Sequence, residues 1–172
     1  MGPVSAEIDM DAPRARAFEA IADLARRPSF TDHFQFGFHL TRIESSGVGA
    51  GARFRTGPRL RRIWMDTVVE QADSPHRIVE HGRGGRSNRI PCSTVWELLE
   101  GPGSLTRVRV SHWTEPSIHI DRALEVLSGT ARRQERGWRE ALRRLRDTLE
   151  SDRPVPRLVA PAGGNRYPTG VP

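Results

Sequence analysis

The chain has 172 residues, of which 36% are hydrophobic and 28% are charged, and its formal net charge is +6 at pH 7. This composition is ordinary for one soluble globular domain and excludes a disordered chain. Cys92 is the single cysteine, which excludes an internal disulfide. No apolar run approaches the ~18 residues that a membrane span requires, and no secretory signal is visible, so we expect a cytoplasmic protein.

The first part of the chain predicts a strand followed by a helix. Residues 4–9 alternate weakly between apolar and polar side chains, as a strand does. Asp11 before Pro13 is typical of a helix start, because Asp caps free backbone N–H groups and proline fits the first turn. A stripe at helical spacing then predicts a helix, which Pro28 ends: Ala17, Phe18, Ile21, Ala22, Leu24 and Ala25. Residues 29–34 are compatible with a second, one-turn helix.

A long stretch punctuated by glycine and proline follows and predicts one antiparallel strand after another. The expected strands cover residues 36–44, 52–56, 63–71, 77–82, 92–100 and 105–115. By the period of two, Val108, Val110 and His112 share one face of the last strand, and Trp96 shares a face with Leu98 in the strand before it.

The rest of the chain predicts a long amphipathic helix over residues 118–150 and then a tail. Gly129 and Gly137 lie inside this stretch, each unfavourable by about 1 kcal/mol relative to alanine, which indicates a bend or the close approach of another element. From residue 151 to residue 172 proline and glycine dominate. We therefore expect a single domain over residues 1–150 and a disordered tail after it.

Several pieces of the sequence carry a resemblance to a known family. They are residues 8–13 (Ile-Asp-Met-Asp-Ala-Pro) followed by 17–23, the glycine-containing turn into a strand at 49–54, the pair 95–98 and 105–110, and the closing helix at 138–150. With them the chain resembles the helix-grip superfamily, also called START-like or SRPBCC, over about residues 4–149. This superfamily includes plant hormone binders of the pollen-allergen type, steroid-transfer domains and bacterial polyketide cyclases.

The resemblance implies an α+β helix-grip fold, in which a seven-stranded antiparallel sheet wraps around a long C-terminal helix and two short helices follow the first strand. It also implies a cavity between sheet and helix for a hydrophobic or aromatic molecule, polyketide- or lipid-like. It does not imply a reaction, because fold does not fix function. No cofactor is expected. The residues that we expect to contact the ligand are Phe36, Phe38, Trp64, Trp96, Leu98, Val108, Val110, Leu124 and Leu127.

His112 and Asp66 are the candidates for catalysis. His112 would hydrogen-bond a ligand or act as a general base near neutral pH, or else it is a buried histidine satisfied by its neighbours. Asp66 would pair with His112 or with an arginine if its face of strand 63–71 is inward, and it would be solvated if that face is outward. Both faces of that strand are apolar, so the sequence leaves this choice open, and with it the position of Trp64. The histidine spacings do not favour a metal site.

All 27 basic residues are arginine, a choice that codon bias in a GC-rich genome explains. Acidic residues intersperse the arginines of the last helix, which favours a solvated face with ion pairs over a nucleic-acid surface. Our leading hypothesis is a protein that binds a hydrophobic small molecule, and the sequence is also compatible with a homodimer. The first alternative is an enzyme, a cyclase or dehydratase acting on a polyketide-like substrate. The second is an arginine-rich module that binds a macromolecule.

Overall fold

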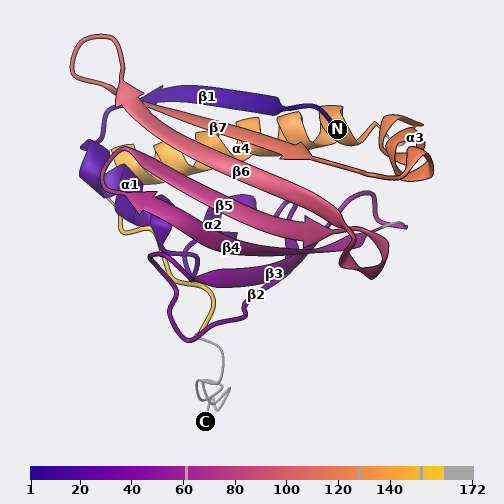
Figure 1. Cartoon of the computed structure of the whole chain (residues 1–172). Helices are drawn as coiled ribbons and strands as arrows, with labels where there is room; N and C mark the ends of the chain where they lie inside the picture. Colours follow the sequence, from indigo (N-terminus) through magenta and orange to yellow (C-terminus); the bar gives the residue numbers. More distant parts are fainter. Residues whose placement is uncertain (61, 128, 152, 161–172) are drawn as a thin grey trace.

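The computed structural model describes residues 1–60, 62–127, 129–151 and 153–160, and within them a curved antiparallel sheet wraps one side of a long helix (Figure 1). The strand order is β1-β7-β6-β5-β4-β3-β2. The strands are β1 (Val4–Met10), β2 (Phe36–Leu40), β3 (Gly51–Thr56), β4 (Ile63–Asp73), β5 (Arg77–Gly84), β6 (Ile90–Glu100) and β7 (Thr106–Thr114). The helices are α1 (Arg14–Ala22), α2 (Pro28–Thr31), η1 (Arg86–Asn88), α3 (His119–Leu127) and α4 (Thr130–Glu150).

The order of the strands follows from short connections between neighbours. Strands β2 to β6 each pair with the next strand in the chain, and β1 closes the series by pairing with β7 from Val4 opposite His112 to Met10 opposite Thr106. Helices α1 and α2 connect β1 at one edge of the sheet to β2 at the other edge. This arrangement confirms the predicted helix-grip architecture with seven strands and two short helices after the first strand.

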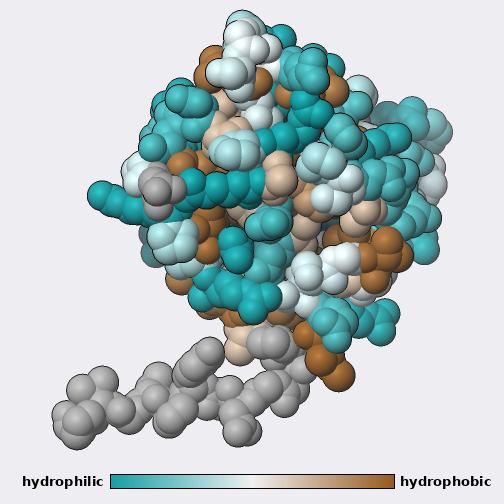
Figure 2. Space-filling view, turned by 90° about the vertical axis from the view of Figure 1, so that its left-hand side faces the viewer, coloured by the Kyte–Doolittle hydropathy of each residue, from teal (hydrophilic) through white to brown (hydrophobic). Residues whose placement is uncertain are grey.

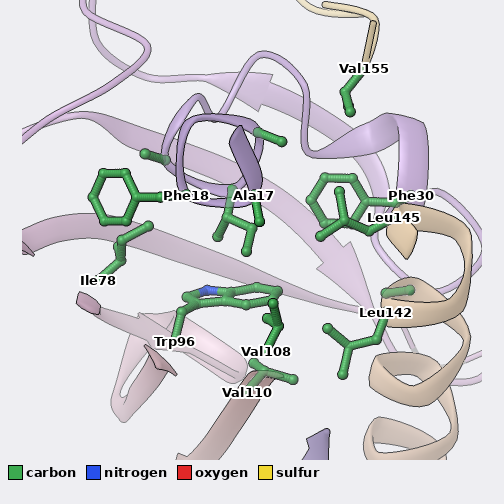
Figure 3. Packing of buried hydrophobic residues seen from close by; sticks show 14 of the residues in the cluster. Ala17, Phe18, Phe30, Ile78, Trp96, Val108, Val110, Leu142, Leu145 and Val155 are labelled. Atoms are coloured by element: carbon green, nitrogen blue, oxygen red, sulfur yellow. The ribbon is translucent and has the colours of Figure 1, made fainter. Parts of the chain in front are cut away.

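The solid core lies toward one end of the molecule, where α1 and the C-terminal half of α4 meet the sheet. Figure 3 shows Trp96, Val108 and Val110 of the sheet facing the helix side chains Leu142 and Leu145, all of them buried. Large apolar side chains at helical spacing on α4 are buried, and at strand spacing alternate side chains of β6 and β7 are buried. The surface around this end, seen in Figure 2, is mainly hydrophilic with scattered apolar residues.

In place of the single helix expected over residues 118–150, the structure has two. Gly129 separates α3 from α4 with a φ of +62°, a left-handed conformation that glycine adopts without steric cost. Gly137 remains inside α4 and serves a different purpose. A β-carbon at this position would lie 2.6 Å from Cγ of Phe34, so glycine lets the Phe34 ring pack directly on the helix backbone. One glycine thus gives the bend and the other the close approach.

The chain after α4 has defined contacts that its proline-rich composition does not predict. Val155 is buried in the core, and the N–H of Leu158 donates to the carbonyl of Ala25 at 2.9 Å. Arg157 donates to Asp23 at 2.7 Å and to Ser45 at 2.9 Å. Residues 153–160 therefore lie against the body of the domain. The rest of the expected tail, residues 161–172, lies outside the described residues.

Replacing Gly137 by alanine should destabilise the fold, although Gly→Ala inside a helix usually stabilises by about 0.5–1 kcal/mol. The added methyl group overlaps the Phe34 ring, and overpacking of this kind costs about 1–3 kcal/mol. Urea denaturation of Gly137→Ala would measure the loss. In a Phe34→Ala background the overlap is gone, so the same substitution should be neutral or stabilising there. Equal effects in the two backgrounds would contradict the contact.

Candidate functional site

A cavity of about 600 Å³ lies between the inner face of the sheet, α3 and the N-terminal half of α4. Its walls are mainly apolar, and the apolar side chains come from four different elements and one loop: Phe34, Phe36, Ile63, Met65, Ile90 and Leu124. The N-terminal half of α4 contributes Thr130, Gln134 and Gly137 to the wall. The lining of the cavity includes α3, which lies at the opposite end of the molecule from α1 (Figure 1).

The side chains of α4 explain why the space is hollow at this end and filled at the other. The buried residues of its C-terminal half are large and apolar, among them Leu142, Leu145 and Leu149. In its N-terminal half the inward positions carry Gln134, which donates to Oγ1 of Thr56 on β3, and Gly137, and only Trp138, next to the solid core, is large and apolar there. The same change occurs along β7, where apolar side chains give way to polar ones at the cavity. The hollow is therefore a consequence of residue size along two facing elements.

His112 lies at the inner end of the cavity and is 5% exposed. Its Nδ1 shares a hydrogen bond of 2.9 Å with Oγ1 of Thr94, and its Nε2 has no hydrogen-bond partner among the described residues. Burial lowers the pKa of His112 to about 4, against smaller opposing effects of Glu80 and Glu125. At neutral pH the imidazole is therefore uncharged, and Nε2 is available either to donate or to accept a proton in a hydrogen bond.

Beneath the cavity lies a buried ion pair that the sequence analysis did not identify. Arg27 and Glu80 are 2.7 Å apart, and each side chain is 3% exposed. Glu80 also accepts hydrogen bonds from Nε1 of Trp96 at 3.0 Å and from Oγ1 of Thr67 at 3.2 Å. The Arg27 guanidinium lies over the Trp96 ring at 4.9 Å. These bonds satisfy the Glu80 carboxylate, as a buried charge requires.

The sequence does contain signals for these residues. Glu80 shares a face of β5 with the core residue Ile78 by the period of two, so its side chain has to point inward. Gln134 interrupts the apolar stripe of α4, and Gln35 lies between two phenylalanines that line the cavity. A polar residue at an apolar position of a periodic pattern is the signal in each case.

The structure brings some of the predicted site residues to the cavity and places others beside it. Phe36, Leu124 and His112 line the cavity wall. Phe38 stacks on Phe54, with ring centroids 5.6 Å apart, in a small satellite cluster. The remaining inward-facing residues are fully buried in the solid core next to the cavity: Trp96, Leu98, Val108 and Val110.

Three predicted residues lie away from the cavity. The inward face of β4 carries Met65, while Trp64 and Asp66 belong to the opposite face. Leu127 is on the solvent side of α3 and is 84% exposed. Here the helical stripe predicted for one continuous helix does not continue inward, because the break at Gly129 changes the direction of the chain.

Asp66 pairs with an arginine and not with His112. It receives hydrogen bonds from Arg53, at 2.9 Å to one carboxylate oxygen, and from Asn88. The hydrogen bond from Arg53 is the main reason that the pKa of Asp66 lies below its ordinary value. Asp66 is therefore an ionised residue held on the outer side of the sheet, and His112 remains as the candidate acid–base group of the cavity.

The surroundings of Cys92 and of the α4 arginines do not favour a catalytic or nucleic-acid-binding role. Cys92 is buried, and burial raises the pKa of its thiol to about 12, which makes it a poor nucleophile. Arginines on α4 pair with neighbouring carboxylates, as Arg139 does with Glu135 four residues away. Within the described parts of the chain, no three His, Cys, Asp or Glu side chains gather as a metal site requires.

The mouth of the cavity carries exposed apolar side chains. Leu124 of α3 lines the cavity and is 48% exposed. Ile63 lies across the mouth on β4 and is also exposed. None of the helices in the described residues combines the length and hydropathy that crossing a membrane requires.

A curved seven-stranded sheet around a C-terminal helix, with a cavity between them, defines a helix-grip domain of the SRPBCC type. Residues 11–150 match the family model described as Activator of Hsp90 ATPase homolog 1-like protein, and the chain belongs to this family. No curated protein is detectably similar in sequence to the chain.

Solved structures share the fold at low sequence identity. DynU16, a protein in the dynemicin biosynthetic locus, is 19% identical with a TM-score of 0.61; the match covers 92% of this chain but 51% of DynU16, so this chain spans about half its length. The KanY protein is 17% identical with a TM-score of 0.69, over 87% of this chain and 99% of KanY. A protein from Thermus thermophilus is 18% identical with a TM-score of 0.65, over 87% and 98% of the two chains.

His112 should make the fold sensitive to acid. Its folded-state pKa of about 4 lies below the ~6.5 of an unfolded histidine, so its stabilising contribution is complete above pH ~6.5 and is lost as the pH falls toward 4. The loss is on the order of 3 kcal/mol for such a difference in pKa. Urea denaturation at pH 7 and pH 4 should show a smaller loss for His112→Gln than for the wild type. Equal losses would contradict a buried neutral imidazole.

Proposed function

We propose that the protein binds a hydrophobic or aromatic small molecule, polyketide- or lipid-like, in the cavity between the sheet and α4. The observation that supports this most strongly is the cavity itself. Its volume of about 600 Å³ is in the range of ~300–1,000 Å³ of small-molecule sites, and it combines apolar walls with a few buried polar groups.

Burial of apolar surface provides only part of the binding free energy, and hydrogen bonds from polar groups have to provide the rest. Burial of ~300 Å² of apolar ligand surface at ~25 cal/mol per Å² contributes about 7 kcal/mol. Loss of translational and rotational freedom costs at least ~4 kcal/mol, so apolar contact alone gives weak binding. A tightly bound ligand therefore needs hydrogen bonds from the inner end of the cavity, where His112 and Gln134 lie.

N-phenyl-1-naphthylamine, an uncharged aromatic probe whose fluorescence rises in apolar surroundings, should bind in the cavity and be displaced by fatty acids, sterols or aromatic polyketides. Leu124→Ala removes a wall residue and should weaken probe binding about three- to tenfold, because some tens of Å² of apolar contact are lost. A fluorescence titration measures both effects.

Leu127→Ala is the matched control, since it makes the same change one turn further along α3 outside the cavity wall. This variant should bind the probe as the wild type does. Equal weakening in the two variants would place the probe on the surface of α3 instead. Absence of binding by the probe and by the whole ligand panel, with no thermal stabilisation at high concentration, would overturn the proposal.

A second function is supported by one observation, the unpartnered Nε2 of His112 at the inner end of the cavity. A neutral imidazole in that position has a ring nitrogen free to take a proton from carbon next to a carbonyl group, the step that a polyketide cyclase or dehydratase requires, and its low pKa makes it a weak base for this step. In this alternative the apolar wall positions a flexible chain and His112 is the general base.

Linear β-polyketone chains incubated with the protein test this alternative. If His112 is the base, the wild type should form cyclised, ultraviolet-absorbing product, and His112→Gln should reduce the rate at least about 100-fold. Binding of N-phenyl-1-naphthylamine should change little in the same variant, which separates a loss of chemistry from a loss of fold. Equal rates in the two proteins, or no product with the wild type, would contradict the enzymatic role.

A further inference from the structure

Unpartnered buried polar atoms gather around one small void beside the main cavity. Among the described residues, six buried side-chain nitrogen or oxygen atoms have no hydrogen-bond partner. Four of them belong to residues that line this void: Nε of Arg27, Oε1 of Gln35, Nε2 of His112 and Nε1 of Trp138. All four residues are at most 5% exposed.

This gathering is too costly to be incidental. A buried donor or acceptor without a partner costs about 1–3 kcal/mol, and folded proteins leave few of them. Four residues that carry such atoms line this one space, while the neighbouring Glu80 carboxylate is fully hydrogen-bonded, and this combination points to a polar group of a bound molecule at that position.

The size and place of the void restrict that polar group. Its volume is about 10 Å³, which accommodates a single oxygen-sized atom. Thr56, Met65, His112 and Gln134 line both the void and the main cavity. The void and the cavity therefore share part of their walls, and a space of about 10 Å³ at that shared wall takes a one-atom polar substituent of a bound molecule but not a bulky one.

The unpartnered atoms also restrict the chemistry. Nε1 of Trp138 and Nε of Arg27 only donate hydrogen bonds, and Oε1 of Gln35 only accepts them. A carbonyl oxygen would leave Gln35 unsatisfied, because it has no proton to donate. A carboxylate has the same defect, carries two oxygens, and would lie close to the Glu80 carboxylate. A hydroxyl group both donates and accepts through one oxygen atom and satisfies both kinds of partner.

We propose that the ligand carries a neutral hydroxyl group, an alcohol or a phenol, that occupies this void and is held by Trp138, Gln35 and His112. The inference rests on the proposed function, since the apolar body of the same molecule fills the main cavity. The hydroxyl then supplies the hydrogen bonds that apolar burial alone does not provide.

Three naphthalene derivatives that differ in one substituent test the inference: 2-naphthol, 2-methylnaphthalene and 2-naphthoate. Displacement of N-phenyl-1-naphthylamine measures their affinities. By hydrophobic transfer alone 2-methylnaphthalene binds more tightly than 2-naphthol, because a methyl group gains more from burial than a hydroxyl. We expect the reverse order, with 2-naphthol at least about tenfold tighter, and 2-naphthoate weakest.

Two variants locate the preference in the void. Trp138→Phe removes the donor and keeps an aromatic ring, and Gln35→Met removes the acceptor at similar length. In each variant the affinity ratio of 2-naphthol to 2-methylnaphthalene should fall several-fold, while 2-methylnaphthalene binds as before. Trp113→Phe is the matched control, because Trp113 bonds to Glu115 outside this void, and its ratio should equal that of the wild type.

The wild-type ratio decides the outcome even if a core variant does not fold. Equal affinities, or tighter binding of 2-methylnaphthalene, overturn the hydroxyl inference and leave the proposed apolar binding intact. Tightest binding of 2-naphthoate also overturns it, in favour of an anionic ligand. If neither the probe nor any of the three compounds binds, the proposed function fails and this inference fails with it.

Discussion

Helix α4 meets the sheet with two different halves, and the rest of the structure depends on this difference. Toward its C-terminus the helix packs with Leu142, Leu145 and Leu149 against a sheet face rich in large apolar side chains, and this contact holds the fold together. Toward its N-terminus the backbone comes close to Phe34 at Gly137, Gln134 bonds to Thr56 of the sheet, and fewer large apolar side chains point inward. The packed C-terminal half sets the distance between α4 and the sheet. The cavity beside the N-terminal half can therefore exist without removing contacts from the core.

The Arg27–Glu80 pair lies where the filled half and the hollow half meet. Each charge is taken out of water, so the pair contributes less to stability than its short distance suggests. Its hydrogen bonds with Trp96 and Thr67 instead hold side chains from the start of α2, β4, β5 and β6 in one arrangement. Fixed polar groups next to an apolar cavity can orient a bound molecule through hydrogen bonds. A purely apolar core would not provide such orientation.

Much of the fold was accessible from the sequence, because strand and helix periodicity is a local property. The period of two placed Trp96 with Leu98, and Val108 with His112, on the inner face, as the structure has them. It failed to decide the orientation of Asp66, since both faces of β4 carry apolar residues. The helical period extended the stripe to Leu127, and the structure instead breaks the helix at Gly129, so that the direction of α3 is set by packing that the local sequence does not show. Which half of α4 meets a hollow, and which polar atoms lack partners there, are properties of residues far apart in sequence.

The ionic side chains of the cavity lie on its α3 and α4 walls, among them Asp121, Glu125 and Arg136, and its inner end carries neutral polar groups. The net charge of +6 comes from arginines that are largely on the surface, several of them paired with carboxylates. Inside, Arg27 and Glu80 cancel each other, and burial keeps the His112 imidazole neutral at physiological pH. The inner end of the cavity therefore presents donors and acceptors without net charge. A site of this kind distinguishes molecules by shape and by the direction of their hydrogen bonds, since Arg27 and Glu80 already neutralise each other and an added ion would lose its hydration there.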